Sequence, residues 1–240
     1  FMKVAPLYHA LTAAADFEVK IIHTGQHYDA NMSDTFFEDL GLPRPDYHLD
    51  VGSGSHAQQT GNVMIKYEEV AIAERPDWTV VVGDVNSTAA VAMVCAKLHI
   101  PVVHLEAGLR SGDRSMPEEI NRLITDSISD LLWTPSVDGD EHLAAEGVPE
   151  WRVERVGNIM LDSYELMSSK IDADTTMSDL GFAAGKYAVV TLHRPSNVDL
   201  EDSLNLLVDQ LEKVSVAIDL VFPVHPRTHS NMKKFDLLDR

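Results

Sequence analysis

The chain has 240 residues, of which 45% are hydrophobic and 24% are charged. This composition is typical of a globular protein with one large or two ordinary cores, and it excludes a disordered or fibrous chain. With 19 Lys and Arg against 38 Asp and Glu, the formal net charge is −19. That charge argues against a nucleic-acid partner, because no excess of cations is present to bind phosphates.

The single cysteine, Cys95, lies in the apolar run of residues 89–98. One cysteine excludes an internal disulfide, and the apolar surroundings favour a buried structural thiol over a nucleophile. Apolar stretches stay below the roughly 18 residues of a membrane span, and no leader of a secreted protein precedes them. We therefore expect a cytoplasmic protein with no membrane partner.

Short β-rich runs alternate with segments of helical periodicity. Strands are expected over residues 18–23, 47–51, 78–82, 101–105, 131–134, 153–156, 187–192 and 220–224, and helices over 1–11, 32–40, 56–73, 87–98, 117–129, 138–146, 160–168 and 201–216. Continuous apolar runs such as residues 80–82 are typical of strands covered on both faces, so the sheets should be parallel. The predicted fold class is α/β with doubly wound parallel sheets.

A polar stretch at residues 172–178 precedes a second series of strand, helix and strand. We therefore place a domain boundary near residues 158–165. One Rossmann-like domain is expected over residues 1–160, and the beginning of a second over residues 161–240. An α/β domain normally opens with a strand, and the last residues stop in a helix-like segment, so further elements are expected beyond both ends.

Charged or titratable residues follow the most apolar of the predicted strands: Asp84, Glu106, His193 with Arg194, and His225. In open parallel sheets, ligands bind beyond the carboxyl ends of the strands. Turns favour Gly, Asn, Asp and Ser, so a glutamate at position 106 is unusual there. This placement indicates a site, although Asp84 can equally cap the helix that follows it.

The predicted helix over residues 117–129 begins with a proline, carries an apolar face that includes Ile120, and places Glu118 and Arg122 four residues apart. Taken alone, that pair reads as a surface ion pair worth roughly 0.3–0.5 kcal/mol. A loop of glycines and cations, which includes Arg110, leads from Glu106 into this helix. Carboxylates and arginines close in sequence indicate proton transfer beside a cationic pocket.

The histidine and cysteine spacing indicates no metal site built by the protein, because no helical His-x-x-x-His or Cys-rich pattern occurs. Phosphate-loop, nucleophile-elbow and Gly-x-Gly-x-x-Gly motifs are also missing from this sequence. No cofactor is therefore expected. His193 and His225 are each followed closely by an arginine, which suits a phosphate-bearing ligand.

Several ordered motifs resemble the non-hydrolysing UDP-N-acetylglucosamine 2-epimerase family: Gly83-Asp84, Glu106-Ala107-Gly108-Leu109-Arg110, Pro117-Glu118-Glu119-Ile120-Asn121-Arg122, and His193-Arg194 with Asn197. The resemblance runs along the whole sequence. It implies two Rossmann-like domains arranged as in two-domain glycosyltransferases, with a UDP-sugar in the cleft. It also implies interconversion of UDP-N-acetylglucosamine and UDP-N-acetylmannosamine for polysaccharide precursors, by a cytoplasmic homodimer.

The resemblance also implies residue roles. Asp84, Glu106 and Glu118 correspond to the acid/base carboxylates, while Arg122 and His193 correspond to groups that support the departing diphosphate. Substrate-binding roles are implied at matching positions: Lys3, Gln26, Arg110, Arg194, Asn197 and His225. The family's allosteric use of positions such as Gln26 and His225 is not expected in its usual form, because an arginine expected near Asn62 is missing.

Three other readings stay open at this point. The His193-Arg194-Pro195-Ser196-Asn197 motif is also seen in relatives that act on diacetamido-uronic acids. A second reading is an enzyme that releases free sugar, or a glycosyltransferase of the same fold. A third is a sugar-nucleotide-binding protein without catalytic activity.

Overall fold

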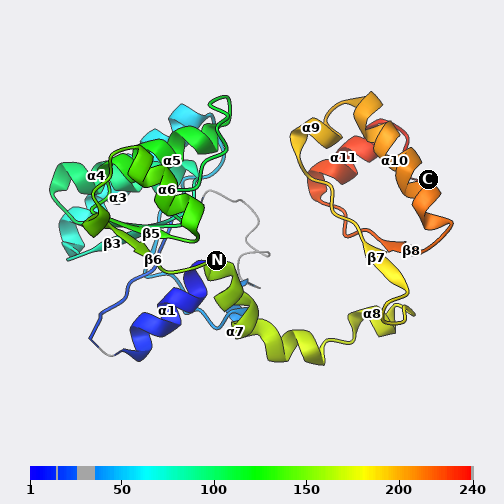
Figure 1. The fold of residues 1–240 in the computed structure, drawn as a ribbon, viewed down its shortest axis with the longest axis horizontal. Helices are drawn as coiled ribbons and strands as arrows, with labels where there is room; N and C mark the ends of the chain where they lie inside the picture. Colours follow the sequence, from blue (N-terminus) through cyan, green and yellow to red (C-terminus); the bar gives the residue numbers. More distant parts are fainter. Residues whose placement is uncertain (15, 26–35, 239–240) are drawn as a thin grey trace. The chain divides into compact units, whose positions relative to one another are not determined.

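The computed structural model describes residues 1–14, 16–25 and 36–238. The chain divides into two compact units, residues 1–169 and residues 170–240. Both this division and the expected boundary at residues 160/161 fall within one helix, α7 (Ile159–Ala173). Figure 1 shows the elements of each unit along the chain.

The first unit contains parallel sheets, as the apolar runs predict. Its strands are β1 (Ile22–His23), β2 (Tyr47–His48), β3 (Thr79–Val82), β4 (Val102–Leu105), β5 (Leu131–Thr134) and β6 (Val153–Arg155). Strands β1 and β2 form a two-stranded sheet, and β3-β4-β5-β6 form a four-stranded sheet in sequence order. Every pairing is parallel. The carboxyl ends of β3 and β4 therefore lie side by side.

Helices lie on both faces of the four-stranded sheet (Figure 1). They are α1 (Val4–Ala13), α3 (His56–Glu74), α4 (Asn86–Leu98), α5 (Pro117–Ile128), α6 (Val137–Ala145) and α7, with a 3-10 turn at Glu150–Arg152. Helices α3, α4 and α5 pack in a row. The main core lies between α3, α4 and the strands, and Cys95 is fully buried in it, as expected.

The second unit is built around two parallel strands, β7 (Tyr187–Val189) and β8 (Asp219–Val221). Its helices are α8 (Thr176–Asp179), α9 (Pro195–Val198), α10 (Glu201–Ser215) and α11 (Pro226–Lys234). Val198, Leu204 and Val208 form the centre of its small core. The alternation predicted from the sequence is confirmed as an α/β fold. The short helices α8 and α9 were not predicted, because each has only one turn and no periodic apolar pattern.

Helix α5 differs from its expected packing. The periodicity predicts that its apolar residues face the core, yet Ile120 is 39% exposed. The fully buried side chains of α5 are polar instead: Glu119, Thr125 and Asp126. The apolar pattern holds in part, since Ile128 packs against the main core, but hydrogen-bonded polar groups occupy the face that packs on the strand ends.

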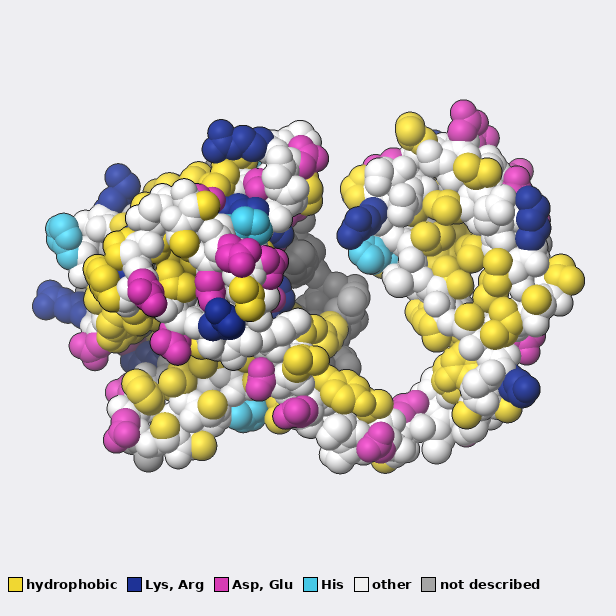
Figure 2. Space-filling model, in the orientation of Figure 1, with side chains coloured by type: hydrophobic (Ala, Val, Ile, Leu, Met, Phe, Trp, Pro, Cys, Tyr) yellow, Lys and Arg dark blue, Asp and Glu magenta, His cyan; other side chains and the backbone are white. Residues whose placement is uncertain are grey.

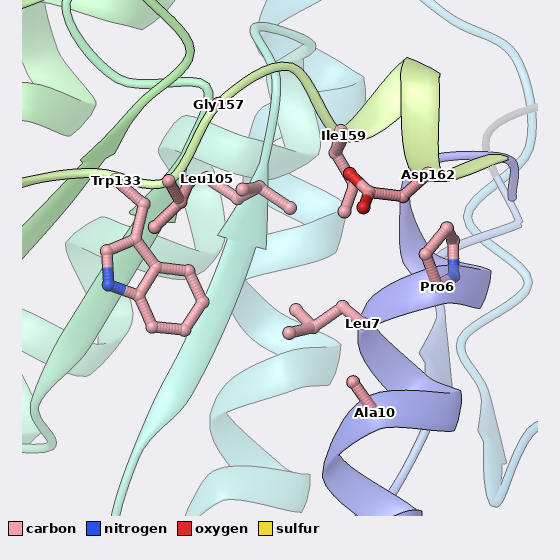
Figure 3. Close-up of a pocket in the computed structure, with 9 residues that line it drawn as sticks. Pro6, Leu7, Ala10, Leu105, Trp133, Gly157, Ile159 and Asp162 are labelled. Carbon is pink, nitrogen blue, oxygen red and sulfur yellow. The ribbon is translucent and has the colours of Figure 1, made fainter. Parts of the chain in front are cut away.

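An apolar cavity of about 260 Å³ lies on the face of the sheet that carries α1 and the start of α7 (Figure 3). Leu7 of α1, Leu105 of β4 and Trp133 of β5 point into it, and Asp162 is the acidic residue among the described residues that line it. None of the predicted site residues that the structure describes lines this cavity. Its apolar walls do not suit a diphosphate.

The surface carries the acidic excess of the sequence. Figure 2 shows acidic side chains scattered over both units, mixed with uncharged surface. Helix α7 also exposes hydrophobic side chains, with Leu161 65% and Tyr164 58% exposed. Within the described parts of the chain, no helix is both long and apolar enough to span a membrane.

Candidate active site

The site is built on the turns that follow β3 and β4. Gly83 takes a left-handed conformation with φ +69°, which lets the chain leave β3 sharply. Its amide donates to the carbonyl oxygen of Leu105 at 3.0 Å, so the ends of the two strands are held together. Glu106, directly after β4, has φ +73°, a conformation that a residue with a side chain rarely adopts. Such outliers concentrate at functional sites.

Lys3 and Glu106 form an ion pair above Gly83. The ammonium group of Lys3 contacts Oε2 of Glu106, whose side chain is 12% exposed. A Cβ atom on Gly83 would lie 3.4 Å from Nζ of Lys3 and 3.6 Å from Oε2 of Glu106. The missing side chain of Gly83 therefore leaves room for this pair. Two predicted site residues, more than 100 positions apart in the sequence, meet here.

Asp84 is held by helix α5. Its carboxylate accepts from Nη2 of Arg122, and its backbone oxygen accepts from Nδ2 of Asn121 at 2.9 Å. The alternative role of Asp84 as a helix cap is not observed. Helix α4 has Val85 at its N-cap position and no side-chain cap hydrogen bond.

The surface ion pair between Glu118 and Arg122 is not observed either. Arg122 pairs with Asp84 and, at 3.2 Å, with Glu119. Glu118 is half-buried and has neither a hydrogen bond nor an ion pair to any of the described residues. Among the three predicted acid/base carboxylates, it is the one without a charged partner in the described structure.

Glu119 anchors the loop between β4 and α5. It is 3% exposed and accepts from the amides of Ser111 and Gly112, at 2.9 and 3.0 Å, and from the Ser111 hydroxyl at 3.0 Å. Burial alone would raise the pKa of Glu119, but these hydrogen bonds and Arg122 lower it from 4.5 to about 2. Glu119 is thus a fixed anion.

Arg110 has its guanidinium turned inward. It lies 2.7 Å from Asp126 and 2.7 Å from Glu146, and its side chain is only 8% exposed. Desolvation works against its charge, but these two carboxylates raise the pKa of Arg110 further. The role of Arg110 in substrate binding stays a prediction, because both terminal nitrogens of its guanidinium already contact carboxylates in this structure.

Sequence reasoning did not single out three buried polar residues beside the site: His104, Glu119 and Asp126. Two signals could have found them. His104 is a polar residue inside the otherwise apolar strand Val102–Leu105, so it needs buried partners. On α5, Glu119, Arg122 and Asp126 recur at the spacing of one helix face.

The predicted residues of the second unit follow β7 and β8. The rings of His193 and His225 have centroids 6.0 Å apart. His225 caps α11, because its Nδ1 accepts from the amide of Arg227 at 3.1 Å. Arg194 is exposed and Asn197 is half-buried, at the start and within the single turn of α9.

Two expectations have no direct test here. Gln26 lies outside the described residues. No group of three or more His, Cys, Asp or Glu side chains in the described ranges could hold a metal ion. The structure brings predicted site residues together in two ion pairs at neighbouring strand ends, Lys3 with Glu106 and Asp84 with Arg122. This set can transfer protons and stabilise an anionic leaving group.

Comparison with known proteins identifies relatives of this chain. The model of a family described as UDP-N-acetylglucosamine 2-epimerase matches residues 9–240. The UDP-N-acetylglucosamine 2-epimerase of Methanocaldococcus jannaschii is 41% identical over 245 residues, which covers 100% of this chain and 66% of that protein. The UDP-2,3-diacetamido-2,3-dideoxy-D-glucuronate 2-epimerase of Pseudomonas aeruginosa is 39% identical over 241 residues, or 99% of this chain and 67% of the relative.

A solved structure of the M. jannaschii UDP-GlcNAc 2-epimerase in complex with UDP-GlcNAc and UDP has a TM-score of 0.88 to this chain at 39% identity. The match covers 99% of this chain and 66% of that one. The chain thus spans about two thirds of the length of these relatives. Because the family model and these relatives cover nearly all of it, the chain belongs to the UDP-N-acetylglucosamine 2-epimerase family.

Proposed function

We propose that this protein interconverts UDP-N-acetylglucosamine and UDP-N-acetylmannosamine. No carbonyl activates the proton on C2, so cleavage of the C1–O bond leads, and its electron pair leaves with UDP. A carboxylate then takes the C2 proton, giving a 2-acetamidoglucal. UDP adds back after a proton is delivered to the opposite face of C2. The reaction needs two proton-transfer groups and a site that retains UDP.

The observation that carries this proposal is the presence of two ion pairs, Lys3–Glu106 and Asp84–Arg122, at the ends of two adjacent strands. Carboxylates supply the proton transfers. The two cations supply positive charge where the diphosphate develops negative charge, and such preorganised charge is worth more in a partly dry site than in water. Glu106 and Arg122 are 12% and 17% exposed, so the site is partly dry.

Glu118 and Glu119 have different roles in the proposal. Glu119 is held by the loop and by Arg122, so its lone pairs are already used. Glu118, the preceding residue on α5, has no hydrogen-bond or ion-pair partner among the described residues. Its carboxylate is therefore available to contact a substrate. We therefore assign proton transfer to Asp84, Glu106 and Glu118, and support of the diphosphate to Arg122.

The second unit has its own part in the proposal. We propose that His193, Arg194, Asn197 and His225 bind the UDP portion. The neighbouring imidazoles and the exposed guanidinium of Arg194 support this role. Isothermal titration of UDP would test it. His193→Ala should weaken UDP binding at least tenfold, whereas His229→Ala, on the exposed part of α11, should not.

Proton NMR in deuterated water, with the full-length protein and UDP-N-acetylglucosamine, tests the reaction. We expect deuterium at C2 of both epimers without accumulation of free UDP. Release of free N-acetylmannosamine would show a hydrolysing enzyme. Binding without any C2 exchange over hours would show a non-catalytic sugar-nucleotide-binding protein.

A second candidate substrate is a UDP-diacetamido-uronic acid. It is favoured by the P. aeruginosa relative, which is 39% identical to this chain, and by the motif from His193 to Asn197. Its chemistry at C1 and C2 is the same. The ratio of kcat/KM for the two sugars decides between them, and a higher value for the uronic acid would replace the first assignment.

We further propose that the protein works as a cytoplasmic homodimer that supplies precursors for polysaccharides. The family resemblance supports these points, and the buried thiol of Cys95 suits a reducing compartment. Analytical ultracentrifugation of the full-length protein tests the dimer. A single monomeric species at micromolar concentration would contradict it.

A further inference from the structure

Four ionisable side chains are connected beside the turns that follow β3 and β4, and all of them except Glu146 are buried; we call this series the buried chain. Nδ1 of His104 lies 2.5 Å from Oδ1 of Asp126, and Oδ2 of Asp126 lies 2.7 Å from Nη1 of Arg110. Arg110 continues to both carboxylate oxygens of Glu146, at 2.8 and 2.7 Å. His104 and Asp126 are 0% and 1% exposed, while Glu146 reaches the surface.

Each ring nitrogen of His104 faces an oxygen atom. Nε2 lies 2.8 Å from the carbonyl oxygen of Gly83, which can only accept a hydrogen bond. Nδ1 faces a carboxylate that Arg110 also holds as an anion. Both ring nitrogens therefore have an acceptor oxygen within hydrogen-bond distance. The carboxylate of Asp126 is shared between the imidazole of His104 and the guanidinium of Arg110, and Arg110 compensates its negative charge in the interior.

This buried chain reaches the backbone on each side of the candidate site. His104 holds the carbonyl oxygen of Gly83, the residue before Asp84. Asp126 accepts from the amide of Gly108 at 3.1 Å, two residues after Glu106. Both turns carry a left-handed residue, Gly83 and Glu106. The imidazole and the carboxylate thus join the two turns that present the predicted proton-transfer groups.

The conformation of Glu106 needs such support. A residue with a side chain keeps a left-handed conformation only where its surroundings determine it. The amides of Glu106 and Ala107 both donate to the carbonyl oxygen of Trp133 at 3.0 Å, which fixes the turn on one side. Asp126, through the amide of Gly108, fixes it on the other. Nδ1 of His142 also lies 2.9 Å from the carbonyl oxygen of Gly108. Without Asp126, the turn loses the attachment of the Gly108 amide.

We propose that His104 and Asp126 are positioning residues that hold Asp84 and Glu106 in the arrangement required for proton transfer at C2. The inference rests on the proposed function. Neither side chain reaches a substrate, because both are buried. Their effect should therefore appear in kcat, which depends on the geometry of the reacting groups, more than in KM.

Two variants test this in the full-length protein: His104→Gln, which can hold only one of the two acceptors, and Asp126→Asn, which removes the anion. Tyr67→Phe is the matched control. Tyr67 is 2% exposed and its hydroxyl lies 3.0 Å from Oγ1 of Thr79, at the opposite end of β3. All three lose a buried hydrogen bond, but the control loses it away from the strand ends.

We expect His104→Gln and Asp126→Asn to lower kcat for C2 deuterium exchange by about tenfold or more, with KM changed by less than about threefold. Tyr67→Phe should lose thermal stability while its kcat stays within about twofold of the unmodified protein. If Asp126→Asn does not fold, Glu146→Gln, at the exposed end of the chain, should lower kcat by about threefold. Full kcat in His104→Gln would overturn the proposal.

The experiment also separates this inference from the proposed function. If the unmodified protein shows no C2 exchange, the proposed function fails. A crystal structure of His104→Gln then decides the positioning role. A left-handed Glu106 with the Gly83 and Gly108 turns unmoved would overturn it, and displaced turns would support it.

Discussion

Arg122 on α5 donates to the carboxylate of Asp84 at the end of β3 and lies 3.2 Å from Oε2 of Glu119 on its own helix. One guanidinium thus neutralises two acidic groups from different elements. Asp84 belongs to the predicted proton-transfer groups, whereas Glu119 holds the preceding loop. Arg122 therefore attaches helix α5 to the end of strand β3.

The Asp84–Arg122 pair should show a measurable coupling. In a double-mutant cycle with Asp84→Ala and Arg122→Ala, we expect a coupling free energy of about 1–2 kcal/mol in urea unfolding, because both partners are partly buried. The control pair is Asp199–Arg227 in the second unit, which is 36% and 49% exposed. Its coupling should be smaller than that of the Asp84–Arg122 pair, because solvent screens it. Additive effects of the Asp84 and Arg122 variants would contradict the connection described here.

Glu118 and Glu119 form a natural matched pair for separating activity from stability. Glu118→Gln should abolish C2 exchange while changing the free energy of unfolding by less than about 1 kcal/mol, since this side chain bonds to none of the described residues. Glu119→Gln should lower the free energy of unfolding, because it weakens charge-assisted hydrogen bonds to Ser111, Gly112 and Arg122. NMR exchange and urea unfolding measure the two effects. Normal turnover in Glu118→Gln would remove its assigned role.

The pH dependence of stability should reveal Glu119. Its pKa in the folded protein is about 2, below its usual 4.5, so the unfolded chain binds this proton more readily. The resulting stabilisation is complete above about pH 4.5 and is lost as the pH falls toward 2. Urea unfolding of Glu119→Gln should therefore show a shallower loss of stability over this range than the unmodified protein. Identical slopes would show that the carboxylate carries no such linkage.

The element order was predictable from the sequence because strands and helices here carry clean periodic patterns. Val80 to Val82 and residues 102–105 read as covered strands, and the parallel ladder follows from that. The ends of elements were less predictable. The sequence predicts one strand over residues 187–192, but β7 ends at Val189. Its pairing with β8 stops there, where Val189 lies opposite Val221, the last residue of β8.

The candidate site was predictable in part. Strand ends with Asp84 and Glu106 stood out because parallel sheets present such residues on one edge. The partners of these groups did not stand out. The sequence predicts that Arg122 pairs with Glu118, four residues away on the same helix, because sequence spacing reveals only neighbours within one element. Its contact with Asp84 depends on how α5 packs, and that packing uses the buried polar face of Glu119 and Asp126.

Gly108 offers a test of the close packing that supports the site. A Cβ atom at Gly108 would lie 2.4 Å from the carbonyl oxygen of Gly139 in α6, and its φ is +79°. Gly147 has a similar φ of +83°, and a Cβ atom there would meet no other atom within 4 Å, so it is a matched control. Gly147→Ala should cost about 1–2 kcal/mol for the left-handed conformation alone.

Gly108→Ala should cost about 1–3 kcal/mol more than Gly147→Ala, because α6 or the turn after Glu106 must move to admit the methyl group. The same movement would disturb the hydrogen bond from the Gly108 amide to Asp126. We therefore expect kcat to fall in Gly108→Ala and to stay unchanged in Gly147→Ala. Urea unfolding and C2 exchange measure the two effects, and equal losses of stability in both variants would show that contact with α6 does not constrain the turn.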